Sequence, residues 1–90
     1  MIPQHRALTS LDSLRPLQVW QGVTARVVQS ERITMAVVEI PPGGLVPEHR
    51  HDNEQVGMCL SGSVTFTVGE EKSELGPRGM WRIPSNVPHM

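Results

Sequence analysis

The sequence has little of several features that mark common protein classes. Its single cysteine, Cys59, excludes an internal disulfide, so a reducing cytoplasm is the expected compartment. No apolar run approaches the roughly 20 residues that cross a membrane. The first residues also lack the basic and then apolar profile of a secretory signal. We therefore expect neither a membrane span nor export.

An excess of one sign of charge is also missing. The chain has 8 Lys and Arg residues against 9 Asp and Glu residues, and its formal net charge is −1. The two signs are interspersed along the sequence. A domain that binds nucleic acid normally carries a basic patch or stripe. The sequence therefore predicts no nucleic-acid partner.

Helical periodicity is the third absence. No stretch repeats apolar residues at helical spacing over three turns, whereas 8 Gly and 8 Pro separate short β-branched runs. The clearest alternation places Val64, Phe66 and Val68 on one strand face, with Thr65 and Thr67 on the other. The pattern predicts an all-β sandwich or barrel with very little helix.

The length of 90 residues suits one domain. Residues 1–16 show no clean period, so we expect an N-terminal arm or edge segment with His5 at its surface, followed by a single domain at 17–90. The turn-forming sequence GEEK at 69–72 predicts a hairpin. The predicted strands are 17–23, 24–30, 33–40, 55–62, 63–69, 72–76 and 79–84.

The stretch "IPPGGLVPEHRHDNEQVGMCLSG" holds the main functional clue. Residues two apart on a strand point to the same face, so His49 and His51 present both imidazoles on one side. Gln55 shares this parity, and its amide oxygen could be a third ligand. His89 follows the turn-forming "IPSNVP", which could bring it to the same place. Because imidazole nitrogen is the commonest ligand of zinc-like ions, the pattern favours a metal site.

Other interpretations of these residues remain open at this point. Histidine pairs also occur on strands without a metal, and the preceding prolines and glycines could form an ordinary loop. Glu54 is an alternative ligand, although its parity points it away from the histidines. Cys59 could be a ligand or a nucleophile, but a buried apolar thiol is the favoured interpretation.

The joint spacing of these residues resembles the cupin superfamily. That family's first signature is a glycine, five residues, His-x-His, three or four residues, an acidic ligand, six residues and a glycine. The corresponding residues here are Gly43, His49, His51, Gln55 and Gly62. The family's second signature, Pro-x-Gly-x-x-His, resembles "PSNVPH" at 84–89.

The resemblance implies a cupin-type jelly-roll β-barrel or sandwich. It also implies one divalent metal ion, with zinc, nickel, iron and manganese all compatible, held by His49, His51, Gln55 and His89. The family's barrel continues for several strands beyond its last histidine. We therefore expect the C-terminal closing strands to be missing here, or to be supplied by a partner.

Three positions depart from the family pattern. Gln55 replaces the usual glutamate, Asn86 replaces a glycine, and Met80 stands where many members have aspartate. Asparagine tolerates the left-handed backbone conformation, whereas Met80 has no interpretation from sequence. With only neutral ligands, the ion would keep its +2 charge, attract a small anionic ligand and act as a Lewis acid.

The functional expectation is a metal-dependent enzyme acting on a sugar-acid or dicarbonyl compound by isomerisation or ring opening. Some cupins with glutamine at this place open uronate rings. The alternatives are a non-catalytic sensor or small-molecule-binding cupin, and an iron-dependent dioxygenase. No catalytic acid or base is identifiable, so the enzyme is favoured by the resemblance alone.

The residues after Gln55 complete the expectations. Alternation turns Val56, Met58 and Leu60 outward, and such an apolar face predicts a homodimer. Gly57 shares the ligand parity and is expected to leave room beside the metal. Trp81 and Ile83 are expected in the core. The arginines 78 and 82 are expected to be surface charges, with a substrate carboxylate as the alternative partner.

Overall fold

A computed structural model describes residues 7–90, so His5 and the start of the predicted arm lie outside the described residues. The described chain is almost entirely β, which confirms the predicted fold class. A single-turn 3-10 helix at Leu11–Ser13 is its one helical element. No helix of the described residues is long and apolar enough to span a membrane. The strands are β1 (Leu17–Trp20), β2 (Val23–Gln29), β3 (Thr34–Glu39), β4 (Gln55–Met58), β5 (Val64–Val68), β6 (Glu71–Leu75) and β7 (Met80–Ile83).

The chain divides into two compact units, the first ending at Val46 and the second running from Pro47 to Met90. The first unit contains one antiparallel sheet in the order β1-β2-β3. The β2–β3 register runs without a shift from Thr24 opposite Glu39 to Gln29 opposite Thr34.

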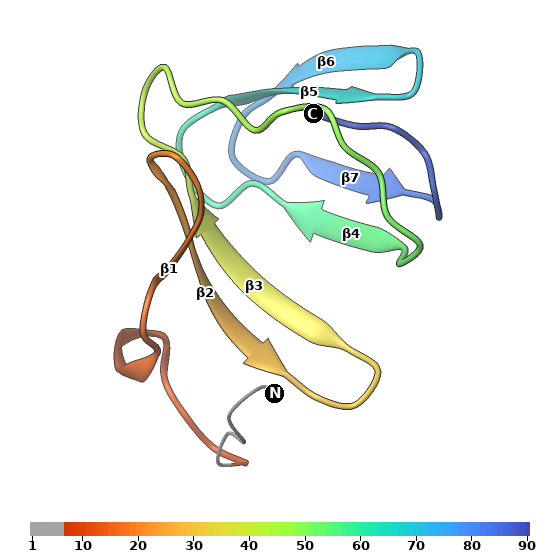
Figure 1. Cartoon of the computed structure of the whole chain (residues 1–90). Coiled ribbons are helices and arrows are strands. Elements are labelled where there is room, and N and C mark those ends of the chain that lie inside the picture. The colour runs from red at the N-terminus through yellow and green to blue at the C-terminus, as the bar shows by residue number, and fades with distance from the viewer. Residues whose placement is uncertain (1–6) are drawn as a thin grey trace. The chain divides into compact units, whose positions relative to one another are not determined.

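The second unit contains two antiparallel pairs, β4–β7 and β5–β6. The β5–β6 hairpin lies between β4 and β7 in the chain, so one pair is nested inside the other (Figure 1). Nested antiparallel pairs belong to the jelly-roll architecture. The hairpin turns at residues 69 and 70, within the predicted 69–72. Figure 1 shows the two pairs as separate layers of this unit.

The end of the chain extends the β5–β6 layer. Thr67 and Met90 exchange two backbone hydrogen bonds of 2.9 Å each, and the Gly69 amide donates to the Pro88 carbonyl at 2.9 Å. His89 forms a bridge with Val68 on one side and with His49 on the other. The residues around both histidines therefore continue the sheet beside β5.

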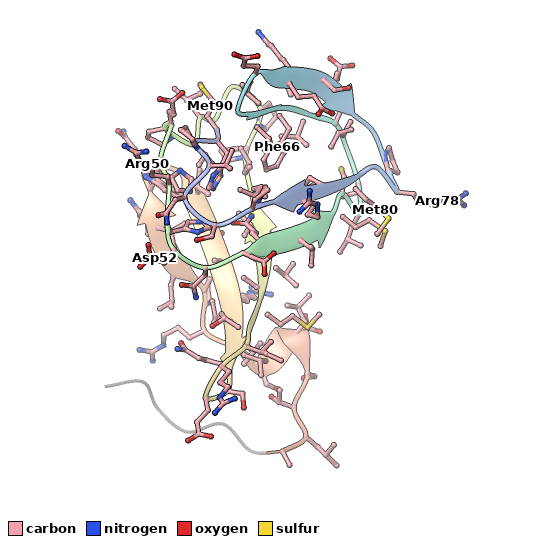
Figure 2. The ribbon with its side chains drawn as sticks, turned by 90° about the vertical axis from the view of Figure 1, so that its right-hand side faces the viewer. Arg50, Asp52, Phe66, Arg78, Met80 and Met90 are labelled. Atoms are coloured by element: carbon pink, nitrogen blue, oxygen red, sulfur yellow. The ribbon has the colours of Figure 1, made fainter. Side chains whose placement is uncertain are left out.

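Aromatic packing joins the two layers of the second unit. Phe66 of β5 stacks on Trp81 of β7, with ring centroids 4.7 Å apart and planes at 27°. Figure 2 shows Phe66 between the hairpin and the β4–β7 pair. Ile83, two residues from Trp81 on the same face, is fully buried. Ile83 lies in the core as predicted, whereas Trp81 is part-buried and stacks on Phe66.

Gly57 accommodates this packing rather than a ligand. It pairs directly with Trp81 across the β4–β7 ladder. A Cβ added at Gly57 would lie 2.3 Å from Trp81 Cζ2 and 2.4 Å from its Cε2. The indole therefore lies against the backbone of β4. The expectation that Gly57 leaves room beside a metal ion is wrong, because the side chain of Trp81 on the neighbouring strand occupies that space.

The opposite face of β4–β7 is exposed and mostly apolar, with Arg82 as its charged residue. Val56 is 76% exposed, Met58 45% and Leu60 67%. Met80, which had no interpretation from sequence, pairs with Met58 on this face and is 71% exposed. Cys59 is buried and its thiol donates to the Ser61 carbonyl at 3.4 Å, in line with a structural thiol.

Candidate metal centre

Backbone hydrogen bonds within the second unit bring the two histidine motifs together. His49 and His89 pair by two bonds of 2.9 Å, each amide donating to the other residue's carbonyl. The Asn86 amide donates to the His51 carbonyl at 2.8 Å. Both histidine segments are therefore fixed to each other by the main chain before any side chain is considered.

A tight turn returns His89 to this position. The Val87 amide closes the turn on the Pro84 carbonyl at 3.3 Å. Asn86, the third residue of the turn, has a φ of 62°. This is the left-handed region in which asparagine is the best tolerated residue after glycine. The replacement of the family's glycine by Asn86 therefore preserves the turn, as expected.

The three imidazole rings form one cluster. The ring centroids are 4.1 Å apart for His49 and His89, 4.8 Å for His51 and His89, and 5.6 Å for His49 and His51. Each residue offers a ring nitrogen within 4.8 Å of the others. His89 is buried and the other two are half-buried. These three histidines are the group of side chains within residues 7–90 that could hold a metal ion.

Each of the three rings is held in the same tautomer by a backbone carbonyl. Nδ1 of His49 donates to the Pro47 carbonyl at 2.8 Å. Nδ1 of His51 donates to the Asn53 carbonyl at 2.8 Å, and Nδ1 of His89 to the Val87 carbonyl at 2.9 Å. Because a carbonyl only accepts, the proton of each neutral ring must lie on Nδ1. Each Nε2 therefore carries a lone pair, which is the arrangement of metal-binding histidines.

Gln55, the first residue of β4, places its side chain against this cluster. Its Oε1 lies 3.2 Å from His51 Nε2. In the tautomer fixed by Asn53, both of these atoms are acceptors, so they do not bond to each other directly. A cation beside them would satisfy both lone pairs. The separation is also that of two donors in a tetrahedral zinc site, roughly 3.3 Å from the Zn–N and Zn–O bond lengths.

The environment of His89 keeps its ring neutral. Burial lowers the pKa of His89 most, and the nearby His49 and His51 lower it further, while the hydrogen bond to the Val87 carbonyl opposes the shift. His89 Nε2 is buried and has no hydrogen-bond partner among the described residues. A neutral ring with a buried lone pair fits a metal ligand and carries a cost without one.

The other residues weighed from sequence lie elsewhere. Glu54 is exposed and does not belong to the histidine cluster. Arg82 pairs with Val56 on the outward face of β4–β7, away from Gln55. Arg78 lies at the end of β4–β7 opposite to Asp52 (Figure 2). Both arginines are exposed, which agrees with surface charges rather than with a substrate contact.

The first unit has a surface hollow of about 250 Å³ beside its 3-10 helix. Its lining is mainly aliphatic and includes Leu11, Leu14, Val28 and Met35, with Arg26 as the one charged residue. No group of metal-ligating side chains lines it. The chemistry of the described residues is therefore concentrated at the histidines.

Residues 36–90, more than half of the chain, match the family model of the cupin domain. The chain therefore belongs to the cupin domain family. No curated protein matches the sequence. The matched region contains both histidine motifs and Gln55, so the family and the geometry agree on where a metal would bind.

The sequence predicted His49, His51, Gln55 and His89 as ligands, but it did not predict the groups that orient the rings. The structure brings His49, His51 and His89 together and places Gln55 against His51. The orienting groups are main-chain carbonyls, which every residue has, so the sequence does not show which of them accept from the rings. Trp81 was expected in the core, but its place opposite Gly57 depends on the β4–β7 register, which spacing does not give.

Proposed function

We propose that this cupin binds one divalent metal ion through Nε2 of His49, His51 and His89, with Oε1 of Gln55 as the fourth ligand. The observation that carries the proposal is the common tautomer of the three rings, each with Nδ1 on a carbonyl. The buried lone pair of His89 supports it. Nitrogen and amide oxygen ligands suit zinc, nickel, iron and manganese alike.

The donor set argues for a small anionic ligand. Three neutral imidazoles and a neutral amide leave the charge of a divalent ion uncompensated, which attracts a carboxylate or an enolate. Three carboxylates, Glu48, Asp52 and Glu54, are close to the histidines in the sequence. All three are exposed, and solvent and salt screen exposed charges strongly. Their repulsion of an anionic ligand is therefore weak.

We further propose that the protein is an enzyme for sugar-acid or dicarbonyl compounds, by isomerisation or ring opening. A bound divalent ion would supply Lewis-acid polarisation of a substrate oxygen. The chain's own residues hold the donors in place, and both His89 and Ile83, the cross-strand partner of Gln55, are buried. The cytoplasmic location rests on the single cysteine, and the homodimer rests on the exposed Val56, Met58, Leu60 and Met80.

The metal site is tested by ligand variants. His51→Ala should lower zinc affinity steeply, because it removes one of four donors. His5→Ala is the matched control and should leave the metal content unchanged. Gln55→Glu should tighten divalent cation binding and weaken acetate binding to the loaded protein, because a carboxylate adds negative charge. Elemental analysis and zinc titration measure the first three effects. If no single histidine variant changes metal content, the site does not bind metal.

The enzymatic part has a separate test. Loaded protein is incubated with uronates and small dicarbonyl compounds, and the products are followed by NMR. Turnover that disappears in His51→Ala supports the enzyme. Saturable binding without any product would contradict it and identify a binding or sensor module.

A further inference from the structure

We infer that Trp81 is a specificity-determining residue, whose indole forms the floor of the ligand site and limits it to small carboxylates. The inference rests on the proposed metal site and concerns the space beneath it. It uses only contacts and registers within the second unit.

Two registers place the indole directly below the proposed ligands. On β4, Gln55 and Gly57 share one face, and Gly57 pairs with Trp81. On β5, Phe66 and Val68 share one face, and Val68 bridges to His89. Gln55 and His89 therefore lie at one level between the two sheets. Trp81 lies at the next level, two residues further along β4 and β5.

The indole fills that second layer from one sheet to the other. One side stacks on Phe66 with centroids 4.7 Å apart. The other side lies so close to β4 that a Cβ on Gly57 would be 2.3 to 2.7 Å from three indole atoms. At this level the indole contacts both sheets, so it would obstruct a ligand that extends from the histidines in this direction.

The polar edge of the same ring faces the backbone of β4. Trp81 Nε1 is buried, and a Cβ added at Gly57 would lie 2.7 Å from it. The floor therefore offers a ligand no exposed hydrogen-bond donor, and contact with it is apolar.

The test compares acetate with benzoate on zinc-loaded protein. Trp81→Leu should open space below the site and raise the affinity for benzoate relative to acetate by roughly tenfold, as expected for burying part of an aromatic ring. Zinc affinity should stay unchanged, because Trp81 is not a ligand. Trp20→Leu, in the first unit, is the matched control and should leave both anions unaffected. An unchanged benzoate-to-acetate ratio in Trp81→Leu would overturn the inference.

A second measurement uses the unmodified protein, in case Trp81→Leu does not fold. Acetate bound to the zinc-loaded protein should give nuclear Overhauser contacts between its methyl group and the ring protons of Trp81, and none to those of Trp20. The absence of contacts to Trp81 would overturn the inference. Failure of the proposed function is distinguishable, because the histidine signals would then not respond to zinc at all.

Discussion

The two units of the chain differ in the regularity of their strands and in their chemistry. The first has one three-stranded sheet whose β2–β3 register is unbroken over six residue pairs. The second has two two-stranded pairs, and isolated bridges join His89 to Val68 of β5 and to His49. The histidine cluster lies entirely in the second unit, and the described part of the first unit has no such group.

The difference shows where a β protein of this size can place ligands. Within a ladder, the carbonyls that face the partner strand accept hydrogen bonds from its amides. At the irregular segments around His49, His51 and His89, carbonyls are left over, and each accepts from a ring Nδ1. Broken pairing thus supplies the groups that orient the imidazoles.

The largest expected effect is that of zinc on the second unit. Zinc at one hundred times its dissociation constant should stabilise the folded state by about 2.7 kcal/mol. Hydrogen exchange should slow most at the amides of His49, Asn86 and His89, which pair the two motifs. The amides of the β2–β3 ladder should change less. Equal slowing in both units, or none, would contradict the comparison.

An effect of similar or smaller size is expected from adding a side-chain carbon at Gly57, against which the Trp81 indole already packs. Gly57→Ala places a methyl group against the Trp81 indole and should lower the free energy of unfolding by about 1–3 kcal/mol, as overpacking does. Gly76→Ala is the matched control, because nothing lies within 4 Å of its added Cβ. Urea denaturation measures both variants. Equal stability of the two would show that the indole moves aside without cost.

The smallest expected effect is a pH dependence of the metal-free protein. The pKa of His89 is lowered by burial and by the two neighbouring histidines. The unfolded chain therefore binds a proton near pH 6.5, whereas the native ring does not. The free energy of unfolding should be constant above about pH 7 and should fall as the pH drops below about 6.5. Urea denaturation at several pH values in this range measures this dependence. A free energy of unfolding that does not change with pH would contradict the lowered pKa of His89.

Much of the fold was predictable because strand formation is local. The alternation of Val64, Phe66 and Val68 and the turn at 69–72 predicted the β5–β6 hairpin almost residue by residue. Strand ends were less predictable, since β4 stops at Met58 although the apolar pattern continues to Leu60. Where a ladder ends depends on the partner strand, β7, which starts only at Met80.

The candidate site was predictable to the extent that motif spacing encodes it. The contact between His51 and Gln55 follows from their position four residues apart. The approach of His89 to the other two histidines depends on the turn at Asn86. Asparagine tolerates a positive φ, so this turn was plausible from the sequence. The role of Gly57 was mistaken because its neighbour Trp81 is distant in sequence. Such cross-strand contacts depend on register, and composition does not reveal register.

The central claim is that three rings with protonated Nδ1 present their Nε2 lone pairs to one metal ion. Long-range 1H–15N NMR of the histidine side chains tests it most directly, because the two ring nitrogens give separate signals. We predict that His49, His51 and His89 are Nδ1–H tautomers at about pH 8, and that one equivalent of zinc shifts their Nε2 signals together. Nε2–H tautomers in the metal-free protein, or zinc that leaves these signals unmoved, would contradict the account.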